Sequence, residues 1–277
     1  ASEDISFDPK KILFAGELSL DGTLRPIRGA LSIAQVARAK GMDALVLPIE
    51  NAAEAALIDG LAVYGAESLG DVVAHLTSEE KNVLIVAKRP VFSDEHDDDA
   101  PLDEIRGQEH AKRALEVAAA GAHNIALYGP PGTGKTMLAR ALQSILPPLS
   151  PESLIEVTTI HSYAGSAEGA IVAHPPFRSP HHTASYASLI GGGAIPKPGE
   201  VTLAHKGVLF LDEFPEFKRD CVNALREPLE DKIVSVSRAK SSSVFPANFI
   251  LVAALNPCPC GHFGTARCEC PAHAVER

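Results

Sequence analysis

The sequence of 277 residues contains no apolar run of the roughly 18 residues that a membrane-spanning helix needs. Its first ten residues, ASEDISFDPK, are polar and acidic, and they lack the basic start and the apolar stretch of a secretory signal peptide. Lysine and arginine number 25 against 35 acidic residues, so the formal net charge is −10. These absences predict a cytoplasmic protein that does not enter a membrane and has no general basic face for nucleic acid.

The negative charge is concentrated in the first part of the chain. Residues 1–101 carry 9 lysines and arginines against 18 acidic residues, whereas residues 102–277 carry 16 against 17. Residues 93–101, SDEHDDDAP, contain no large apolar side chain and are typical of a solvated linker. We therefore expect two domains, at 1–92 and 102–277, and any contact with DNA must come from a local basic surface.

The first predicted domain alternates short apolar strands with helices. Strands are expected at 12–20, 44–48 and 61–65, and Asn51 is expected to cap an alanine-rich helix. This alternation predicts a small α/β unit with a partly parallel sheet.

The second predicted domain also alternates strands and helices. Apolar segments at 124–128, 207–213 and 248–256 are each followed by, or end in, glycine or polar residues. The pattern predicts a doubly wound α/β fold with a parallel sheet, and such folds bind ligands at the carboxyl ends of their strands.

Residues 129–136, GPPGTGKT, match the phosphate-binding pattern G-x-x-x-x-G-K-[ST], with an apolar strand before them and a helix after them. The glycines let backbone N–H groups approach phosphate oxygens, and the helix N-terminus adds positive potential. Lys135 is expected to reach the β- and γ-phosphates, and the Thr136 hydroxyl is expected to bind Mg²⁺. The predicted nucleotide-binding residues of this loop are Gly129, Pro130, Pro131, Gly132, Thr133, Gly134, Lys135, Thr136 and Met137. The alternative, a glycine-rich turn without a ligand, is disfavoured by the order of strand, loop and helix.

The apolar segment VLFLDE at 208–213 ends in two carboxylates. Asp212 is predicted to hold the Mg²⁺ shell, and Glu213 is predicted to act as the catalytic base that polarises the attacking water. Asn256 ends the next long apolar strand and can place its amide against the γ-phosphate or that water; an ordinary turn residue is the alternative. Lys135, Glu213 and Asn256 form the predicted catalytic set.

Four of the five cysteines, Cys258, Cys260, Cys268 and Cys270, fall within 13 residues. Such a cluster in a cytosolic chain favours a metal over disulfides, and a tetrahedral zinc site uses four thiolates. The C-x-C spacing is tighter than usual, and His262 or His273 could replace a thiolate. A reduced, proline-rich loop with incidental thiols is the alternative. Cys221 stands alone in a helical stretch and is expected to be a buried core residue.

Further motifs surround these residues. They are RGQE at 106–109, PFRSPHHT at 176–183, ALREPLED at 224–231 and NPCPCG at 256–261. With the phosphate loop and FLDE, they make 102–277 resemble the magnesium-chelatase-like AAA+ ATPases of the ComM/YifB type. The resemblance implies an AAA+ P-loop core that uses ATP and Mg²⁺, forms a homo-hexamer at full length, and holds Gly107 and Gln108 near the adenine. It also implies that the helical lid and the arginine finger lie beyond residue 277.

Residues 14–48 resemble the C-terminal half of a Lon-protease-type domain, which ComM-like proteins carry ahead of the ATPase. Lon-type proteolysis uses a Ser/Lys dyad, and its lysine follows shortly after a Pro-Ile-x-Gly turn, here residues 26–29. At the matching place this chain has Ala30, Leu31 and Ser32, so the base is missing. The segment with the nucleophilic serine is expected before residue 1. We therefore interpret residues 1–92 as a partial, non-proteolytic Lon-like domain.

A stretch rich in glycine, proline and histidine lies at 159–206 and is too long for a plain loop. The resemblance implies that it is the insertion that faces the ring pore, and a basic hairpin is expected at 235–245. The candidates for DNA contact in these two segments are Arg178, Lys197, Arg238 and Lys240. Ordinary solvated charges are the alternative. His181 and His182 are expected to be hydrogen-bonded loop histidines rather than metal ligands.

The resemblance implies a motor that acts on DNA, a helicase that promotes branch migration during uptake and recombination of transforming DNA. Its expected partner is single-stranded or branched DNA. A chelatase-type motor that drives Mg²⁺ insertion into a porphyrin is the second hypothesis, and a non-hydrolysing nucleotide-dependent scaffold is the third. The Lon-like segment and NPCPCG favour the first hypothesis, and the intact Lys135, Asp212 and Glu213 argue against the third.

Overall fold

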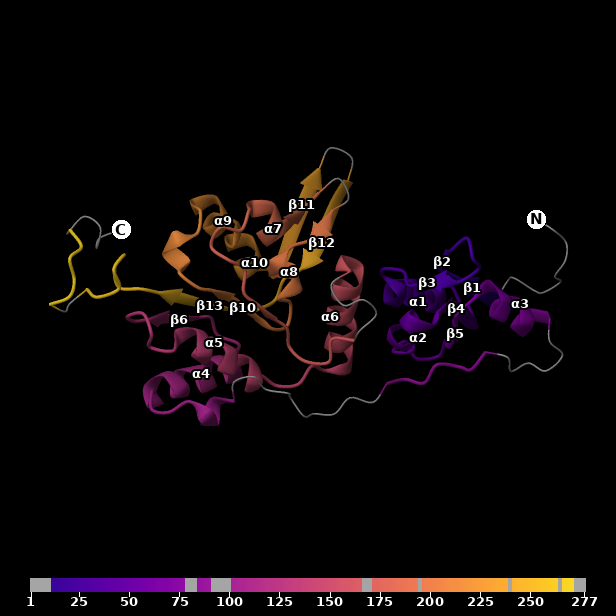
Figure 1. Cartoon of the computed structure of the whole chain (residues 1–277), viewed down its shortest axis with the longest axis horizontal. Helices are drawn as coiled ribbons and strands as arrows, with labels where there is room; N and C mark the ends of the chain where they lie inside the picture. Colours follow the sequence, from indigo (N-terminus) through magenta and orange to yellow (C-terminus); the bar gives the residue numbers. More distant parts are fainter. Residues whose placement is uncertain are drawn as a thin grey trace. The chain divides into compact units, whose positions relative to one another are not determined.

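The computed structural model describes residues 11–77, 84–90, 101–165, 171–193, 196–238, 241–263 and 266–271 (Figure 1). The chain divides by its internal contacts into two compact units. Unit 1 contains Ala1–Ser93 and Pro151–Ala173, and unit 2 contains Asp94–Ser150 and His174–Arg277. The sequence-based division places 151–173 in the ATPase core, whereas the contacts of this segment belong to unit 1.

Unit 1 is built on a parallel sheet of three strands in the order β1–β4–β5 (Figure 1). The strands are β1 (Ile12–Phe14), β4 (Ala44–Pro48) and β5 (Ala62–Ala66). Every residue of β4 is buried, because this strand has a neighbour on each side and both of its faces are covered. The small α/β unit with a parallel sheet is as the sequence predicts.

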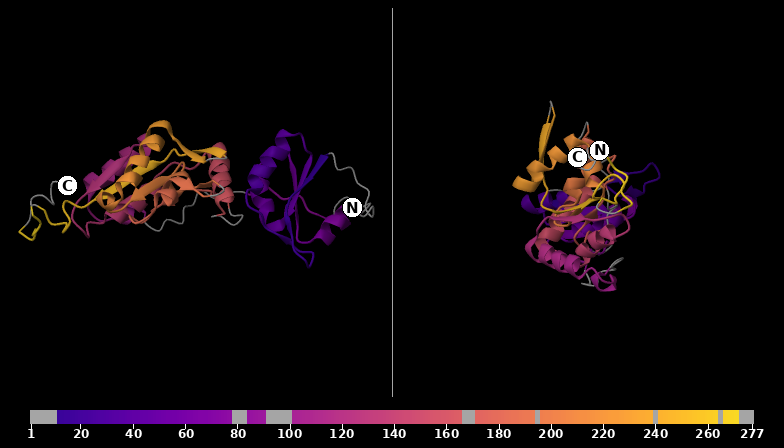
Figure 2. Two further views of the ribbon diagram at one scale, coloured as in Figure 1. Left: turned by 90° about the horizontal axis from the view of Figure 1, so that it is seen from above. Right: turned by 90° about the vertical axis from the view of Figure 1, so that its left-hand side faces the viewer.

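Helices cover both faces of this sheet. The α-helices described in unit 1 are α1 (Ala30–Ala39), α2 (Ile49–Ala55), α3 (Leu69–Thr77) and α6 (Pro151–Ala164). Leu45 and Leu47 of β4 pack with α1 and α2, whereas Val46 packs with Val72 of α3. Figure 2 shows helices on both sides of the indigo strands. α6 packs against α1, and the Gly29 N–H donates to the Ser162 hydroxyl of α6 at 3.1 Å.

The single strand expected at 12–20 is wrong, because residues 15–16 interrupt it. β1 ends at Phe14, and β2 (Glu17–Leu18) pairs antiparallel with β3 (Leu24–Arg25) across a turn. The reversal is fixed by Asp21, whose carboxylate accepts hydrogen bonds from the Thr23 N–H at 3.1 Å and the Thr23 hydroxyl at 2.7 Å. An aspartate that bonds the backbone two residues on is a turn former.

The predicted capping role of Asn51 is also wrong. α2 begins two residues earlier, directly after Pro48, and Asn51 lies inside the helix. The Asn51 side chain is buried, accepts from the Ile27 N–H at 2.8 Å and donates to the Ile27 carbonyl at 2.9 Å. It therefore ties α2 to the segment before α1.

Unit 2 is built on a parallel sheet of four strands in the order β6–β13–β10–β7 (Figure 1). The strands are β6 (Ile125–Tyr128), β7 (Phe177–Arg178), β10 (Val208–Leu211) and β13 (Ile250–Leu255). β13 lies between β6 and β10, although it comes last in the sequence. The P-loop α/β fold with a parallel sheet is as the sequence predicts.

The central strands of unit 2 are apolar throughout because both faces of the sheet are covered. Val208 and Phe210 pack on α4 (Glu109–Gly121) and α5 (Lys135–Ser144), whereas Leu209 and Leu211 pack toward the opposite face. The opposite face is covered by α7 (Tyr186–Ile190), α8 (Glu200–Leu203) and α9 (Arg219–Ala224). Cys221 of α9 lies in this second core, as expected for a buried thiol.

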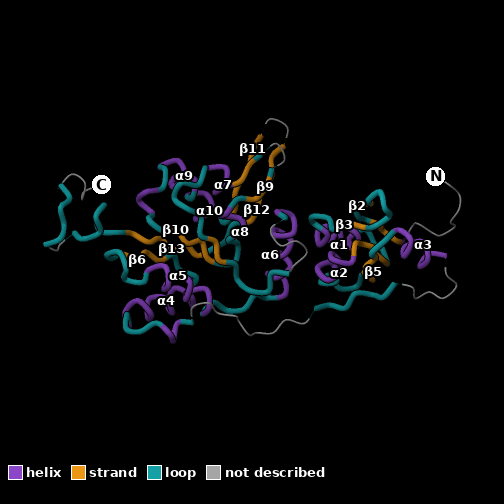
Figure 3. The backbone as a smooth tube through the Cα atoms, viewed as in Figure 1, coloured by secondary structure: helices purple, strands orange, loops and turns teal. Residues whose placement is uncertain are grey.

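Smaller elements complete unit 2. They are η2 (Leu102–Glu104), β8 (Gly191–Gly192), β9 (Lys197–Pro198), η3 (Phe214–Glu216), α10 (Arg226–Asp231), β11 (Ile233–Arg238) and β12 (Ser241–Pro246). β11 and β12 form an antiparallel hairpin, which Figure 3 shows as two long adjacent strands. The expected hairpin at 235–245 is confirmed. Among the helices of the described segments, none has the length and hydropathy to cross a membrane.

Candidate active site

The phosphate-loop pattern lies between β6 and α5, as its sequence context predicts. β6 ends at Tyr128, and α5 begins at Lys135. Gly132 and Gly134 have φ angles of 78° and 82°, a left-handed conformation that favours glycine. The Thr133 hydroxyl donates to the Pro130 carbonyl at 2.9 Å and closes the loop.

The ammonium group of Lys135 is held by three neutral oxygens. It donates to the carbonyls of Gly129 at 2.8 Å and Pro130 at 3.0 Å, and to Asn256 Oδ1 at 3.0 Å. Its three donors are satisfied, yet no carboxylate within the described segments forms an ion pair with it. An anion at this loop would therefore meet an unneutralised positive charge beside a helix N-terminus.

The acidic strand end faces the start of α5. Asp212 follows β10, and its Oδ2 accepts from the Thr136 hydroxyl at 3.2 Å. Asp212 Oδ1 accepts from the backbone N–H of Glu213 at 2.9 Å, and Glu213 adopts a left-handed backbone with φ 52°. A hydroxyl and a carboxylate side by side are the oxygen donors that Mg²⁺ takes.

These groups line one cavity of about 440 Å³. Its lining residues are Pro131, Gly132, Thr133, Gly134, Lys135, Thr136, Met137, Asp212, Glu213 and Asn256. The fold thus brings together the predicted loop, acidic and asparagine residues. Gln108 approaches from the segment before α4, and its amide donates to the Thr133 carbonyl at 3.1 Å; the neighbouring Gly107 has a φ of 69°.

His182 is a neighbour of Glu213 that the sequence did not reveal. Its Nδ1 lies 3.1 Å from Glu213 Oε2, and the two side chains are 30% and 49% exposed. The ring of His181 lies beside it, with 4.1 Å between the ring centroids, and His181 Nδ1 contacts the Thr183 hydroxyl at 2.8 Å. Both histidines are therefore engaged within the protein, as the expectation of hydrogen-bonded loop histidines states.

The four candidates for DNA contact differ in their surroundings. Arg178 of β7 forms a two-pronged ion pair with Glu200, with N···O distances of 2.6 and 2.9 Å, and this pair neutralises its charge. Lys197 of β9 is exposed. Arg238 ends β11 and pairs in the backbone ladder with Ser241, and Lys240 lies outside the described residues.

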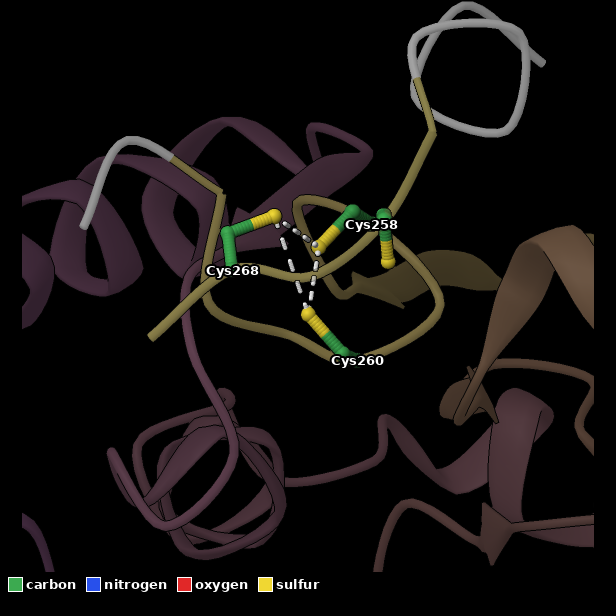
Figure 4. Close-up of side chains that lie close together, drawn as sticks. Cys258, Cys260 and Cys268 are labelled. Atoms are coloured by element: carbon green, nitrogen blue, oxygen red, sulfur yellow. Dashed lines mark hydrogen bonds between the residues drawn. The ribbon is translucent and has the colours of Figure 1, made fainter. Parts of the chain in front are cut away.

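The cysteine segment begins with Cys258, two residues after Asn256. Figure 4 shows the side chains of Cys258, Cys260 and Cys268 close together. Cys258 Sγ lies 3.3 Å from Cys260 Sγ and 3.8 Å from Cys268 Sγ, and the sulfurs of Cys260 and Cys268 are 3.8 Å apart. With Cys270 included, all four sulfurs lie within 4.8 Å of one another. The described residues thus contain one compact set of four thiols.

The thiols of this set differ in acidity. The backbone N–H of His262, followed by the neighbouring thiols, lowers the pKa of Cys260 to about 6. At Cys270 a backbone hydrogen bond with Cys260 lowers the pKa, but the Cys260 side chain, burial and Cys258 outweigh it and raise the pKa to about 12. One negative charge forms easily in the cluster, and each further one is disfavoured by repulsion.

The turn that follows Cys258 packs against the phosphate loop. The Gly261 N–H donates to the Cys258 carbonyl at 2.8 Å, and Gly261 has a left-handed φ of 78°. A Cβ atom at Gly261 would overlap Cδ of Pro131 and lie 2.6 Å from its Cγ. Only glycine allows this close approach of the turn to the Pro131 ring.

Comparison with known proteins places the chain among magnesium chelatase relatives. The family "Magnesium chelatase, subunit ChlI" matches residues 101–277, and "Subunit ChlI of Mg-chelatase" matches residues 1–51. Competence protein ComM of Haemophilus influenzae is 45% identical over 260 residues, which are 92% of this chain and 50% of ComM. Protein YifB of Escherichia coli is 46% identical over 256 residues, or 90% of this chain and 48% of YifB.

Two more matches extend this comparison. An uncharacterized protein of Mycobacterium tuberculosis is 44% identical over 269 residues, which are 96% of this chain and 53% of that protein. The chain thus spans about half the length of the curated relatives that it matches. A chain in a structure of the complex between subunits BchI and BchD of magnesium chelatase has 26% sequence identity to this chain and a TM-score of 0.46. The match covers 57% of this chain and 55% of that one.

Proposed function

We propose that this chain, which belongs to the family of magnesium chelatase subunit ChlI, binds ATP with Mg²⁺ in the cavity beside Lys135 and hydrolyses it. One observation carries the proposal. The phosphate loop, the Thr136–Asp212 pair, Glu213 and Asn256 all open into the same cavity. The phosphate loop, the metal-binding oxygens and a carboxylate beside the place of the attacking water are therefore present in one cavity.

The residues present fit a triphosphate and its metal. Within the described segments, the Lys135 ammonium donates its hydrogen bonds to neutral oxygens and not to a carboxylate. Phosphate oxygens can therefore replace these oxygens as acceptors. Thr136 and Asp212 would hold Mg²⁺, which, when bound, offsets negative charge on the β- and γ-phosphates. The family resemblance implies that Gly107 and Gln108 lie at the adenine side, and the Gln108 amide donates to the Thr133 carbonyl of the phosphate loop.

Glu213 is the base in this proposal. Its carboxylate accepts a proton from the attacking water as the water oxygen bonds to the γ-phosphorus, and the bond from that phosphorus to the bridging oxygen of ADP breaks. The base is half exposed in the cavity, and His182 contacts one of its oxygens. Asn256 directly follows β13, and its side-chain oxygen accepts from the Lys135 ammonium at 3.0 Å.

Nucleotide binding by Lys135→Ala tests the site. Titration with a fluorescent ATP analogue in the presence of Mg²⁺ should show saturable binding by the native protein. Loss of the ammonium should weaken it by at least about tenfold, since a hydrogen bond to a charged group contributes about 1.5–3 kcal/mol. Lys112→Ala is the matched control and should bind normally, because Lys112 of α4 pairs with Glu109 and does not line the cavity. Unchanged binding by Lys135→Ala would exclude this cavity as the nucleotide site.

The substrate of the motor is proposed to be DNA, acted on by a homo-hexamer of the full-length protein. The support is the identity to a competence protein and the near-neutral charge of residues 102–277, which suits local rather than general phosphate contacts. Branched DNA should then stimulate ATP hydrolysis. Stimulation by a porphyrin and Mg²⁺ instead would favour the chelatase-type motor, which the name of the matching family suggests.

Zn²⁺ at the four clustered cysteines is part of this proposal as a structural ion. Each site would select its own metal. The Thr136–Asp212 pair offers the oxygen ligands that Mg²⁺ requires, whereas the cysteine cluster offers the sulfur ligands that suit Zn²⁺.

A further inference from the structure

We propose that Cys258, Cys260, Cys268 and Cys270 bind one Zn²⁺. We also propose that the zinc-bound segment holds the phosphate loop in place through contacts at Gly261 and Asn256, an effect called the brace below. The brace rests on the proposed nucleotide site, whereas the zinc site does not. The zinc site follows from the arrangement of the sulfurs, and the brace follows from where the chain places them.

The sulfur positions fit a tetrahedral zinc centre. A Zn–S bond of about 2.3 Å in a tetrahedron requires sulfurs about 3.8 Å apart. Two of the observed separations are 3.8 Å, the third is 3.3 Å, and no pair of the four exceeds 4.8 Å. The sulfur separations therefore differ from the tetrahedral value by no more than about 1 Å.

The donor set selects the metal. Four thiolates suit zinc or another thiophilic ion, whereas Mg²⁺ requires oxygen ligands. The four cysteines come from two C-x-C pairs of one loop, so binding an ion closes the loop between Cys260 and Cys268. Such a cross-link holds together described residues that form neither helix nor strand, 256–263 and 266–271.

The segment that zinc would order touches the phosphate loop at two points. At one end, Asn256 accepts from Lys135 at 3.0 Å. At the other end, Gly261 packs on Pro131 so closely that a Cβ atom would not fit. Cys258 and Cys260 lie between these two contacts, so an ion held by them fixes both ends of the segment at once. Zinc binding should therefore preorganise the loop for nucleotide.

Metal analysis tests the zinc site. Protein purified without chelator should contain one zinc per chain, and its cluster thiols should react with a thiol reagent only after a zinc-selective chelator is added. Cobalt substitution should give the charge-transfer and intense d–d bands of tetrahedral thiolate coordination. Cys268→Ser and Cys270→Ser should lower the zinc content, whereas Cys221→Ala, outside the cluster, should not. Zinc near zero, with four freely reacting thiols or with disulfides, would overturn the site.

Nucleotide affinity tests the brace. With Mg²⁺ in excess, removing zinc should weaken binding of the fluorescent ATP analogue about five- to tenfold, the scale of losing a preorganised loop, and zinc addition should restore it. Equal affinity with and without zinc would overturn the brace and leave the zinc site standing. Native nucleotide affinity in Lys135→Ala would instead contradict the proposed nucleotide site. Failure of the brace and failure of the nucleotide site are therefore distinguishable.

Gly261→Ala separates the brace from the metal. The added Cβ must push Pro131 away, so nucleotide binding should weaken while zinc content stays at one per chain. Gly41→Ala is the matched control, because Gly41 lies in unit 1 and has a similar φ of 71°, but an added Cβ atom there would meet open space. The variant should lose a similar amount of folding free energy to backbone strain without a change in nucleotide affinity. Native affinity in Gly261→Ala would contradict the brace.

Discussion

Replacement of Glu213 by glutamine tests the hydrolytic mechanism directly. The amide keeps the size of the side chain and its contact distance to His182, but it cannot accept a proton from water. General base catalysis contributes about 10²–10⁴-fold to a rate. The kcat for ATP hydrolysis should therefore fall by about that factor, which corresponds to about 3–5 kcal/mol of lost transition-state stabilisation.

Nucleotide binding should survive this change. The groups proposed to hold the phosphates and Mg²⁺ are Lys135, Thr136 and Asp212, and Glu213 forms no ion pair with Lys135. Removal of one negative charge beside the phosphates should leave ATP binding unchanged or slightly tighter. The assay combines equilibrium titration of the nucleotide with single-turnover hydrolysis in the full-length protein, so that binding and chemistry are measured separately.

Glu216→Gln is the matched control for Glu213→Gln. Glu216 is an exposed carboxylate in η3, three residues further along the chain, and it does not line the cavity. This variant should hydrolyse ATP at the native rate. Hydrolysis at the native rate in Glu213→Gln would refute the base assignment, and equal losses in both variants would show that the effect is not specific to Glu213.

Three more predictions follow from particular side chains. His182→Ala should lower kcat about tenfold with unchanged nucleotide affinity, because His182 orients the Glu213 carboxylate, and His182→Asn should recover part of the rate; a change in affinity alone would contradict this. Replacing Arg238 and Lys240 together with alanine should reduce the slope of log K for duplex DNA binding against log salt concentration by about 0.9 for each phosphate that these side chains neutralise. Basal ATP hydrolysis should be unchanged. An unchanged slope would exclude the hairpin as a DNA contact. Burial raises the pKa of Glu54, which is 0% exposed, so the folded state keeps the proton to a higher pH than the unfolded chain. The free energy of unfolding should then decline as pH rises from the ordinary glutamate range through the folded pKa, and Glu54→Gln should flatten that decline; parallel pH profiles would refute the argument.

The sequence could predict the nucleotide cavity because its parts are local patterns. The phosphate loop depends on glycines and a lysine between one strand and one helix, and the carboxylates depend on the end of one apolar strand. Parallel strands then bring these ends to one edge of the sheet. Residues at 131–137, Asp212, Glu213 and Asn256 meet in the structure for this reason.

Other interactions had no local signal. His182 and Glu213 approach each other only through the packing of the loop after β7 beside the end of β10, and nothing in PFRSPHHT encodes that partner. The single strand expected at 12–20 has a similar cause, because an apolar run shows strand tendency but not that its first part pairs with β4 and its second part pairs with β3. The residue type of Asn51 favours a helix cap, whereas a tertiary partner, the Ile27 backbone, uses its amide instead.

The strand order explains why the thiol turn lies where it does. β13 runs between β6 and β10, and Leu255 pairs with Tyr128 while Ala253 pairs with Leu211. The chain leaving β13 must therefore pass between the start of the phosphate loop and Asp212, so its first residue after the strand, Asn256, meets Lys135. The next few residues cannot leave that edge of the sheet at once, and Gly261 still touches Pro131. Any structure built directly after β13, including a zinc-binding turn, is consequently placed against the loop that is proposed to hold nucleotide.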